Sequence, residues 1–212
     1  MPGTLKGFIY VGRVDNDKWL AVVIDEHERV VSLSLPRESE AEAVNEAKSL
    51  ALARISYRFR SEMDPFIRRV GREVVEYVDL CLKGEKVKKS FNLNVDGLSD
   101  FMKRVLSVVS IIPRGLVTCY GSIAKVVDNP RASRAVGNAV AKNPWPIILP
   151  CHRVVRSDLS LGGYRGGLDI KKRLLRVEGV AVTSTGKVLP SHVIRANELV
   201  KMVKAVDKLS FK

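Results

Sequence analysis

The chain contains no glutamine, and it has only three histidines and three cysteines among its 212 residues. The histidines lie far apart, and no cysteine or histidine has the spacing of a metal site. The odd number of cysteines and the absence of a CxxC pair argue against a disulfide framework. We therefore expect reduced thiols and no bound metal. The cysteines are Cys81, Cys119 and Cys151.

Long apolar runs are also absent. No run is long enough to span a bilayer, and the opening MPGTLKGFIY lacks the basic and apolar regions of a signal peptide. We therefore predict a cytoplasmic protein without a membrane partner. The lack of glutamine beside abundant Lys, Arg and Glu indicates a thermophilic source. Unfolding at moderate temperature would refute that hypothesis.

Positive charge is concentrated in the second part of the chain. Residues 1–94 contain 16 Lys and Arg against 15 Asp and Glu, whereas residues 95–212 contain 20 against 8. A net charge near +12 attracts polyanions, because neutralised phosphates release their counterions. A solubilising surface explains the same charge equally well.

The first part has the pattern of a small sheet with helices. Segments 5–13, 18–24 and 29–35 are rich in β-branched and aromatic residues and are separated by turn residues, which predicts an antiparallel meander. Helices are predicted over 40–54 and from the Asp64-Pro65 cap to Gly84, with Cys81 on its buried face. We expect a strand and then a linker over 85–95.

The second part is mainly helical. A helix is predicted after Ser99, and two short helices over 120–127 and 132–142 have the outline of a helix-turn-helix. Three prolines within 143–150 exclude a regular helix there, so a loop or extended segment leads to Cys151. A helix over 169–178 and an amphipathic helix over 190–209 follow. DNA binding and a packed helix pair of other function explain the helix-turn-helix pattern equally well.

The fold class that follows is α+β with two domains. An N-terminal α/β domain, residues 1–93, contains the small antiparallel sheet and its helices. A mainly helical C-terminal domain, residues 94–212, contains the helix-turn-helix, Cys151 and the terminal helix.

Cys151 is the candidate nucleophile of the sequence. A thiol attacks as its thiolate, which requires a neighbouring base or positive charge, and His152 and Arg153 adjoin Cys151. On an extended chain neighbouring side chains point to opposite sides, so we expect His152 to act through a water or through its ring orientation. A buried cysteine beside a structural histidine is the alternative interpretation.

The segment Pro150-Cys151-His152-Arg153-Val154 resembles the active-site motif of the O6-alkylguanine-DNA alkyltransferases. The similarity spans roughly residues 98–180 and keeps the family's order. Its further motifs are Arg134-Ala135-Val136-Gly137, Asn143-Pro144, Tyr164 with Gly166-Gly167-Leu168, Leu174-Leu175 and Glu178-Gly179.

The resemblance implies direct-reversal DNA repair by a methylated-DNA–[protein]-cysteine S-methyltransferase. Cys151 would take the alkyl group from O6 of guanine, once per molecule and without a cofactor. His152 would reach the sulfur through a water, with Glu178 orienting its ring and Asn143 in the same hydrogen-bond network. Tyr120 would donate toward the departing guanine. O4 of thymine and the size of the adduct stay open.

The resemblance also implies how the DNA is held. The partner would be duplex DNA containing O6-alkylguanine, bound by a monomer that flips the damaged nucleotide out of the helix. Arg134 would fill the vacated stack, with Arg131 available to the DNA and the small Ala135 and Gly137 allowing close approach. The residues implied to line the base pocket are Val154, Val155, Tyr164, Arg165 and Gly166.

Arg165 departs from the family, which often has a smaller residue there. Three other functions remain open: a sensor that binds alkylated DNA without reacting, a transcription factor and a cysteine hydrolase. Cys151 argues against the sensor. No dimerisation surface or base-reading side chains support the transcription factor, and no site for acyl transfer supports the hydrolase.

Overall fold

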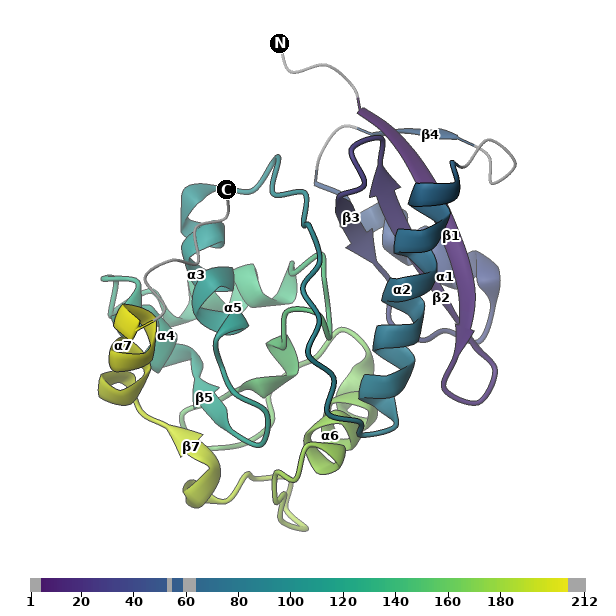
Figure 1. Cartoon of the computed structure of the whole chain (residues 1–212). Coiled ribbons are helices and arrows are strands. Elements are labelled where there is room, and N and C mark those ends of the chain that lie inside the picture. The colour runs from purple at the N-terminus through teal and green to yellow at the C-terminus, as the bar shows by residue number, and fades with distance from the viewer. Residues whose placement is uncertain (1–4, 53–54, 59–63, 206–212) are drawn as a thin grey trace. The chain divides into compact units, whose positions relative to one another are not determined.

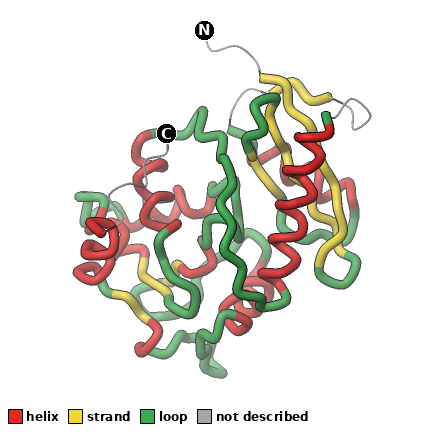
Figure 2. Tube along the Cα trace, viewed as in Figure 1, coloured by secondary structure: helices red, strands yellow, loops and turns green. Residues whose placement is uncertain are grey.

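The computed structural model describes residues 5–52, 55–58 and 64–205. These residues form two compact units. The first contains the described residues up to Leu98 together with Pro144–Pro146, and the second contains Ser99–Asn143 and the described residues from Ile147 onward. Figure 2 shows that strands are concentrated in the first unit and that helices and loops dominate the second. The α+β fold class predicted from the sequence is confirmed.

The first unit is a four-stranded sheet in the order β3-β2-β1-β4. The meander predicted from the sequence is confirmed, because β1 pairs antiparallel with β2 and β2 with β3. No pattern in the sequence predicted β4, which pairs parallel with β1. The strands are β1 (Leu5–Val14), β2 (Lys18–Asp25), β3 (Val30–Leu33) and β4 (Ile55–Arg58).

Two helices cover opposite faces of this sheet (Figure 1). Ser39 caps α1 (Glu40–Leu50), whose buried alanines pack with Val11. Asp64 caps α2 (Pro65–Leu82), which lies against the alternate residues of β1. A Cβ added at Gly12 would lie 2.8 Å from Val75 Cγ1, so the glycine permits the close approach of α2. Successive side chains of β1 therefore point alternately into two apolar layers, one on each face of the sheet.

Three predictions for this part need correction. The first helix ends at Leu50 rather than 54, and residues 85–95 form no strand beyond an isolated bridge from Leu93 to Val30. Their backbone is instead hydrogen-bonded to β3, because Val30 N–H donates to Asn92 O and Asn94 N–H to Val30 O. Cys81 is part-buried rather than fully buried.

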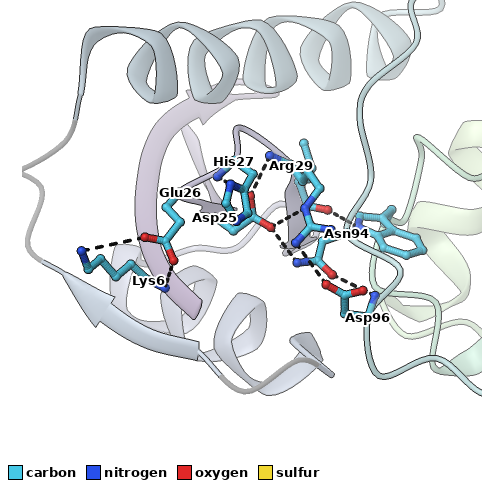
Figure 3. A network of polar contacts seen from close by, with 9 residues as sticks. Lys6, Asp25, Glu26, His27, Arg29, Asn94 and Asp96 are labelled. Atoms are coloured by element: carbon cyan, nitrogen blue, oxygen red, sulfur yellow. Dashed lines mark hydrogen bonds and ion pairs between the residues drawn. The ribbon is translucent and has the colours of Figure 1, made fainter. Parts of the chain in front are cut away.

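A buried carboxylate, Asp25, organises the turn between β2 and β3 (Figure 3). Its Oδ1 accepts the backbone N–H groups of His27 and Arg29 at 2.9 and 3.0 Å. Its Oδ2 accepts Arg29 Nε at 2.8 Å and Asn94 Nδ2 at 2.7 Å. Arg29 also pairs with Asp96 at 3.0 Å. The network therefore ties the turn to the segment that leads out of the first unit.

Residues 144–146 belong to the first unit although both their chain neighbours belong to the second. Trp145 is fully buried and its indole N–H donates to Val30 O at 2.8 Å. Leu33 N–H donates to Pro144 O at 2.9 Å. The segment just before Cys151 is therefore anchored on β3, an arrangement that no local sequence pattern indicates.

The second unit is built around a short parallel sheet in the order β6-β5-β7. Figure 1 shows helices gathered around its strands. The strands are β5 (Val117–Cys119), β6 (Val154–Val155) and β7 (Val193–Ile194). The helices are α3 (Asp100–Ser110), α4 (Tyr120–Val126), α5 (Ser133–Ala141), α6 (Gly167–Val177) and α7 (Ala196–Ala205).

The end of the chain differs from the single helix predicted over 190–209. A 3₁₀ turn, Pro190–His192, and β7 precede α7, and residues 206–209 lie outside the described part. Thr118 Oγ1 donates to Ile194 O at 2.9 Å, and α7 packs against α4 with Leu199 fully buried. Within the described ranges, no helix is long and apolar enough to cross a membrane.

Replacing Asp25 with alanine should destabilise the first unit by about 3 kcal/mol, because buried donors lose their acceptor. Urea unfolding of the full chain measures this change. The matched control is Glu38→Ala, since Glu38 pairs with Lys18 while its side chain is 79% exposed. The control should cost less than about 1 kcal/mol. Equal losses would contradict the assigned role of Asp25.

Candidate active site

Cys151 begins a 3₁₀ turn, Cys151–Arg153, directly after Pro150. The residue is buried, with 6% of its surface exposed. Its N–H donates to Leu149 O at 2.7 Å, and Arg153 N–H donates to Pro150 O at 2.9 Å. The sequence predicted a loop or extended segment before Cys151, and the structure has a tight turn at the cysteine itself.

Both residues that follow Cys151 form hydrogen bonds with the carboxylate of Glu178. His152 Nε2 lies 3.0 Å from Glu178 Oε1. Arg153 donates from Nε to Oε2 at 2.9 Å and from Nη2 to Oε1 at 2.6 Å, a bidentate pair. Arg153 Nη1 also donates to Ile112 O at 2.6 Å. One carboxylate at the end of α6 therefore fixes the orientation of the whole turn.

The charges in this cluster can be assigned. Burial alone would raise the pKa of Glu178, but hydrogen bonds from His152 and Arg153 outweigh it and lower the pKa from 4.5 to about 2. Burial lowers the pKa of His152. A neutral His152 leaves Arg153 as the cation that balances Glu178. The ionised Glu178 accepts, so the proton of neutral His152 lies on Nε2 and the lone pair on Nδ1.

The Cys151 sulfur lies among groups that favour its negative charge. Burial raises the pKa of the thiol, while a hydrogen bond from Asn143 and the charges of Lys171 and Arg165 act in the opposite direction. Asn143 is itself buried and donates from Nδ2 to Leu149 O at 3.0 Å. The resting thiol is therefore protonated, with partners in place for the thiolate.

Lys171 is the residue of the site that the sequence reasoning missed. It is fully buried, and its ammonium donates to Val154 O at 2.6 Å and also to Leu161 O. Burial lowers its pKa from 10.5 to about 8, although the charge of Cys151 raises it. Lys171 and Glu178 are seven residues apart, which is two helical turns, so both lie on the same face of α6, with Glu178 as its C-cap residue. Both residues of this face contact the segment that begins at Cys151. The sequence signal that could have identified Lys171 as a site residue was its position on an otherwise apolar helix face.

Tyr120, the first residue of α4, follows β5 directly. Burial raises the pKa of its hydroxyl, and the charge of Cys151 raises it further, whereas Arg156 lowers it. Its ring lies between two glycines: a Cβ added at Gly137 would be 3.9 Å from Cδ1, and one at Gly162 would be 3.7 Å from Cε2. Tyr120 is therefore a protonated hydroxyl that interacts electrostatically with Cys151.

The helix-turn-helix predicted from the sequence corresponds to α4 and α5, which pack against each other. Val136, Ala139 and Val140 are buried. Ala135 is exposed, beside the exposed Arg134. Arg131, in the turn before α5, is exposed too. The helix therefore presents an arginine and a small side chain to solvent, with Gly137 part-buried against Tyr120.

The five residues assigned to the base pocket have different surroundings. Val154 and Val155 are fully buried in β6, and Val155 belongs to an apolar cluster with Val117 and Leu175. Tyr164 is part-buried, and its side chain lowers the pKa of the Cys151 thiol against the effect of burial. Gly166, also part-buried, is the residue before α6. Arg165 donates from Nη1 to Asn143 O at 3.2 Å and from Nη2 to Ala141 O.

Known proteins are similar to this chain in sequence and fold. Residues 100–180 match the sequence profile described as "6-O-methylguanine DNA methyltransferase, DNA binding domain". The methylated-DNA–protein-cysteine methyltransferase of Methanosarcina acetivorans is 44% identical over 118 residues, which cover 56% of this chain and 72% of that protein. The chain belongs to the methylated-DNA–protein-cysteine methyltransferase family. The family resemblance predicted from the sequence is confirmed.

Two further members show the extent of the similarity. The methylated-DNA–protein-cysteine methyltransferase of Methanothermobacter thermautotrophicus is 40% identical over 114 residues, 52% of this chain, and the match covers 62% of that protein. The crystal structure of Mycobacterium tuberculosis OGT in complex with DNA superposes with a TM-score of 0.59 at 27% identity. That match covers 82% of this chain and 92% of the other, so the family likeness in fold extends beyond the profile region.

No group of three or more His, Cys, Asp or Glu in the described ranges is arranged to hold a metal ion. The three cysteines, all within those ranges, are free thiols.

The depressed pKa of Glu178 predicts a component of acid sensitivity. Because the folded-state pKa lies below the ordinary value, ionised Glu178 stabilises the fold above pH 4.5, and this contribution is lost as the pH falls toward about 2. Glu178→Gln should be less stable at neutral pH and should lose less stability over that acid range. Urea unfolding at several pH values measures both. Glu38→Gln, an exposed substitution, is the control; parallel pH curves for Glu178→Gln and the parent chain would contradict the assignment.

Proposed function

We propose that this protein repairs DNA by direct reversal, transferring a methyl or other alkyl group from O6 of guanine to Cys151. The observation that carries the proposal is the buried Cys151 with His152, Glu178, Asn143 and Tyr120 around it, in a chain of this family. The names of the relatives describe the same reaction. Transfer is stoichiometric and stops after one turnover, because a thioether has no good leaving group.

The hydrogen-bond geometry supports a base for the thiol. His152 Nδ1 is buried and has no hydrogen-bond partner among the described residues. A buried acceptor requires a partner, and one water between Nδ1 and the Cys151 sulfur would supply it. The thiol proton then passes through the water to Nδ1. Glu178 stabilises the imidazolium that forms, as in other nucleophile–histidine–carboxylate sites.

The transfer itself is an SN2 displacement. The Cys151 sulfur forms a bond to the alkyl carbon, the bond from that carbon to O6 breaks, and its electron pair stays on guanine. Tyr120, held protonated close to the sulfur, donates a hydrogen bond to the leaving base. Guanine takes up one proton in place of the one lost by the thiol, so no cofactor is consumed. Lys171 and Arg165 favour the thiolate during the attack.

The helix-turn-helix supports a role in holding duplex DNA. Arg134 and Ala135 are exposed on α5, and Arg131 is exposed just before it. We assign to Arg134 the filling of the stack that the flipped nucleotide vacates, and to Arg131 a phosphate contact. We also assign the lining of the base pocket to five residues, Val154, Val155, Tyr164, Arg165 and Gly166. Burial of both valines favours a backbone contribution from β6.

Three broader assignments belong to the same proposal. The protein acts as a monomer in the cytoplasm, where its free thiols stay reduced. Residues 1–93 form an N-terminal domain, and residues 94–212 hold the acceptor cysteine and the DNA-binding helices.

Peptide mass spectrometry after incubation with a duplex containing one O6-methylguanine tests the reaction. We expect one added methyl on Cys151, none on Cys81 or Cys119, restored guanine in the DNA, and no reaction in Cys151→Ala. DNA binding without methyl transfer would instead indicate a sensor. Repeated turnover of an ester or amide would indicate a hydrolase, and preference for one DNA sequence a transcription factor.

Arginine substitutions test the DNA contacts. Arg131→Ala should reduce the slope of log affinity against log salt by about 1, because one phosphate contact is lost. Arg134→Ala should slow methyl transfer by more than it weakens binding to undamaged duplex, because its side chain acts once the base is flipped. Fluorescence anisotropy and single-turnover kinetics measure these quantities. Arg72→Ala, which removes an exposed charge from α2, is the control. Equal effects of all three variants would refute the assignment.

A further inference from the structure

The charged side chain of Arg165 connects the glycine-rich loop, residues 162–167, to the end of the second helix of the helix-turn-helix. Its Nη1 donates to Asn143 O at 3.2 Å, and its Nη2 donates to Ala141 O. Ala141 is the last residue of α5, so these acceptors belong to the helix end and the residue just beyond it. Helix C-terminal carbonyls lack intrahelical partners and carry partial negative charge, which a guanidinium satisfies.

The same contacts lead to the reactive sulfur. Arg165 holds the backbone of Asn143, whose side chain forms hydrogen bonds with Cys151 and with Leu149 O. The side chain of Tyr164, the preceding residue of the loop, also favours the negative charge of Cys151. Arg165 therefore adjoins one residue that acts on the thiol and holds the backbone of another.

We infer that Arg165 is a positioning residue of the alkyl-transfer site: its planar fork holds Asn143 and the glycine-rich loop in place around Cys151. This inference rests on the function proposed above and assigns to the side chain a role that a smaller residue at this position would not perform. Lysine is not equivalent, because a single ammonium cannot reproduce the rigid fork.

Electrostatics acts in the same direction. The positive charge of Arg165 favours the thiolate of Cys151, opposing the effect of burial, which raises the pKa of the thiol. Among the described residues, further groups that interact electrostatically with the sulfur are Tyr120 of α4, Tyr164 of the loop and Lys171 of α6. His152 follows Cys151 in the turn.

The pH dependence of Cys151 modification by iodoacetamide tests the inference without DNA. We compare the parent chain with Arg165→Met, Arg165→Lys and the control Arg195→Met, which removes an exposed charge from the same unit. Peptide mass spectrometry resolves Cys151 from the other cysteines. At neutral pH, Arg165→Met should react about tenfold more slowly than the parent, and Arg165→Lys about threefold more slowly. The differences should vanish at high pH, and Arg195→Met should match the parent.

Two results would overturn the inference. An Arg165→Met protein that reacts as fast as the parent or faster at every pH would show that the side chain does not favour the thiolate and only shields Cys151 from the reagent. An Arg165→Lys protein that matches the parent would show that the fork geometry is unnecessary. Methyl transfer from O6-methylguanine DNA is measured in parallel. Failure of the parent chain in that assay would refute the proposed function, while the iodoacetamide profiles would still decide the role of Arg165.

Discussion

The buried carboxylate of Glu178 is the constraint on which the site depends. It accepts hydrogen bonds from both His152 and Arg153, the two residues that follow Cys151. A buried charge of this kind is stable only when it is fully paired, and Arg153 supplies the balancing cation. Because Arg153 also donates to Ile112 O, beyond the end of α3, the cysteine turn is attached to two helices at once. The position of Cys151 follows from these attachments.

The same arrangement separates the two requirements of a reactive thiol. Burial raises the pKa of Cys151, which keeps the thiol protonated in the resting protein. Lys171, Arg165 and Asn143 stabilise the thiolate once a proton acceptor is available. His152 remains neutral because burial lowers its pKa, and its Nδ1 is free to accept that proton. The site is thus prepared for a single displacement at a nearby alkyl carbon.

Local sequence patterns predicted much of this structure because the signals were local. The β1–β2–β3 meander and the caps Asp64 and Ser99 came from alternation and cap chemistry. The 3₁₀ turn at Cys151 was not predicted, because the prolines before it indicated only that no regular helix forms there. The β4 pairing with β1 depends on residues about fifty positions apart in the chain, and the hydrogen bonds of residues 92–94 are made to β3. Contacts of that range leave no periodicity in the sequence.

The candidate site shows the same division. The motif around Cys151 identified His152 and the wider family resemblance identified Glu178, whereas Lys171, a lysine on an otherwise apolar helix face, was missed, and the structure shows it to be fully buried with its ammonium donating to Val154 O. The most direct test of the account is the ¹⁵N NMR spectrum of the His152 ring at neutral pH, assigned with a His152→Gln variant. We predict a neutral imidazole protonated on Nε2, with an unprotonated Nδ1. A ring protonated on Nδ1 alone, or an imidazolium, would contradict the assignment of His152 as the proton acceptor held by Glu178.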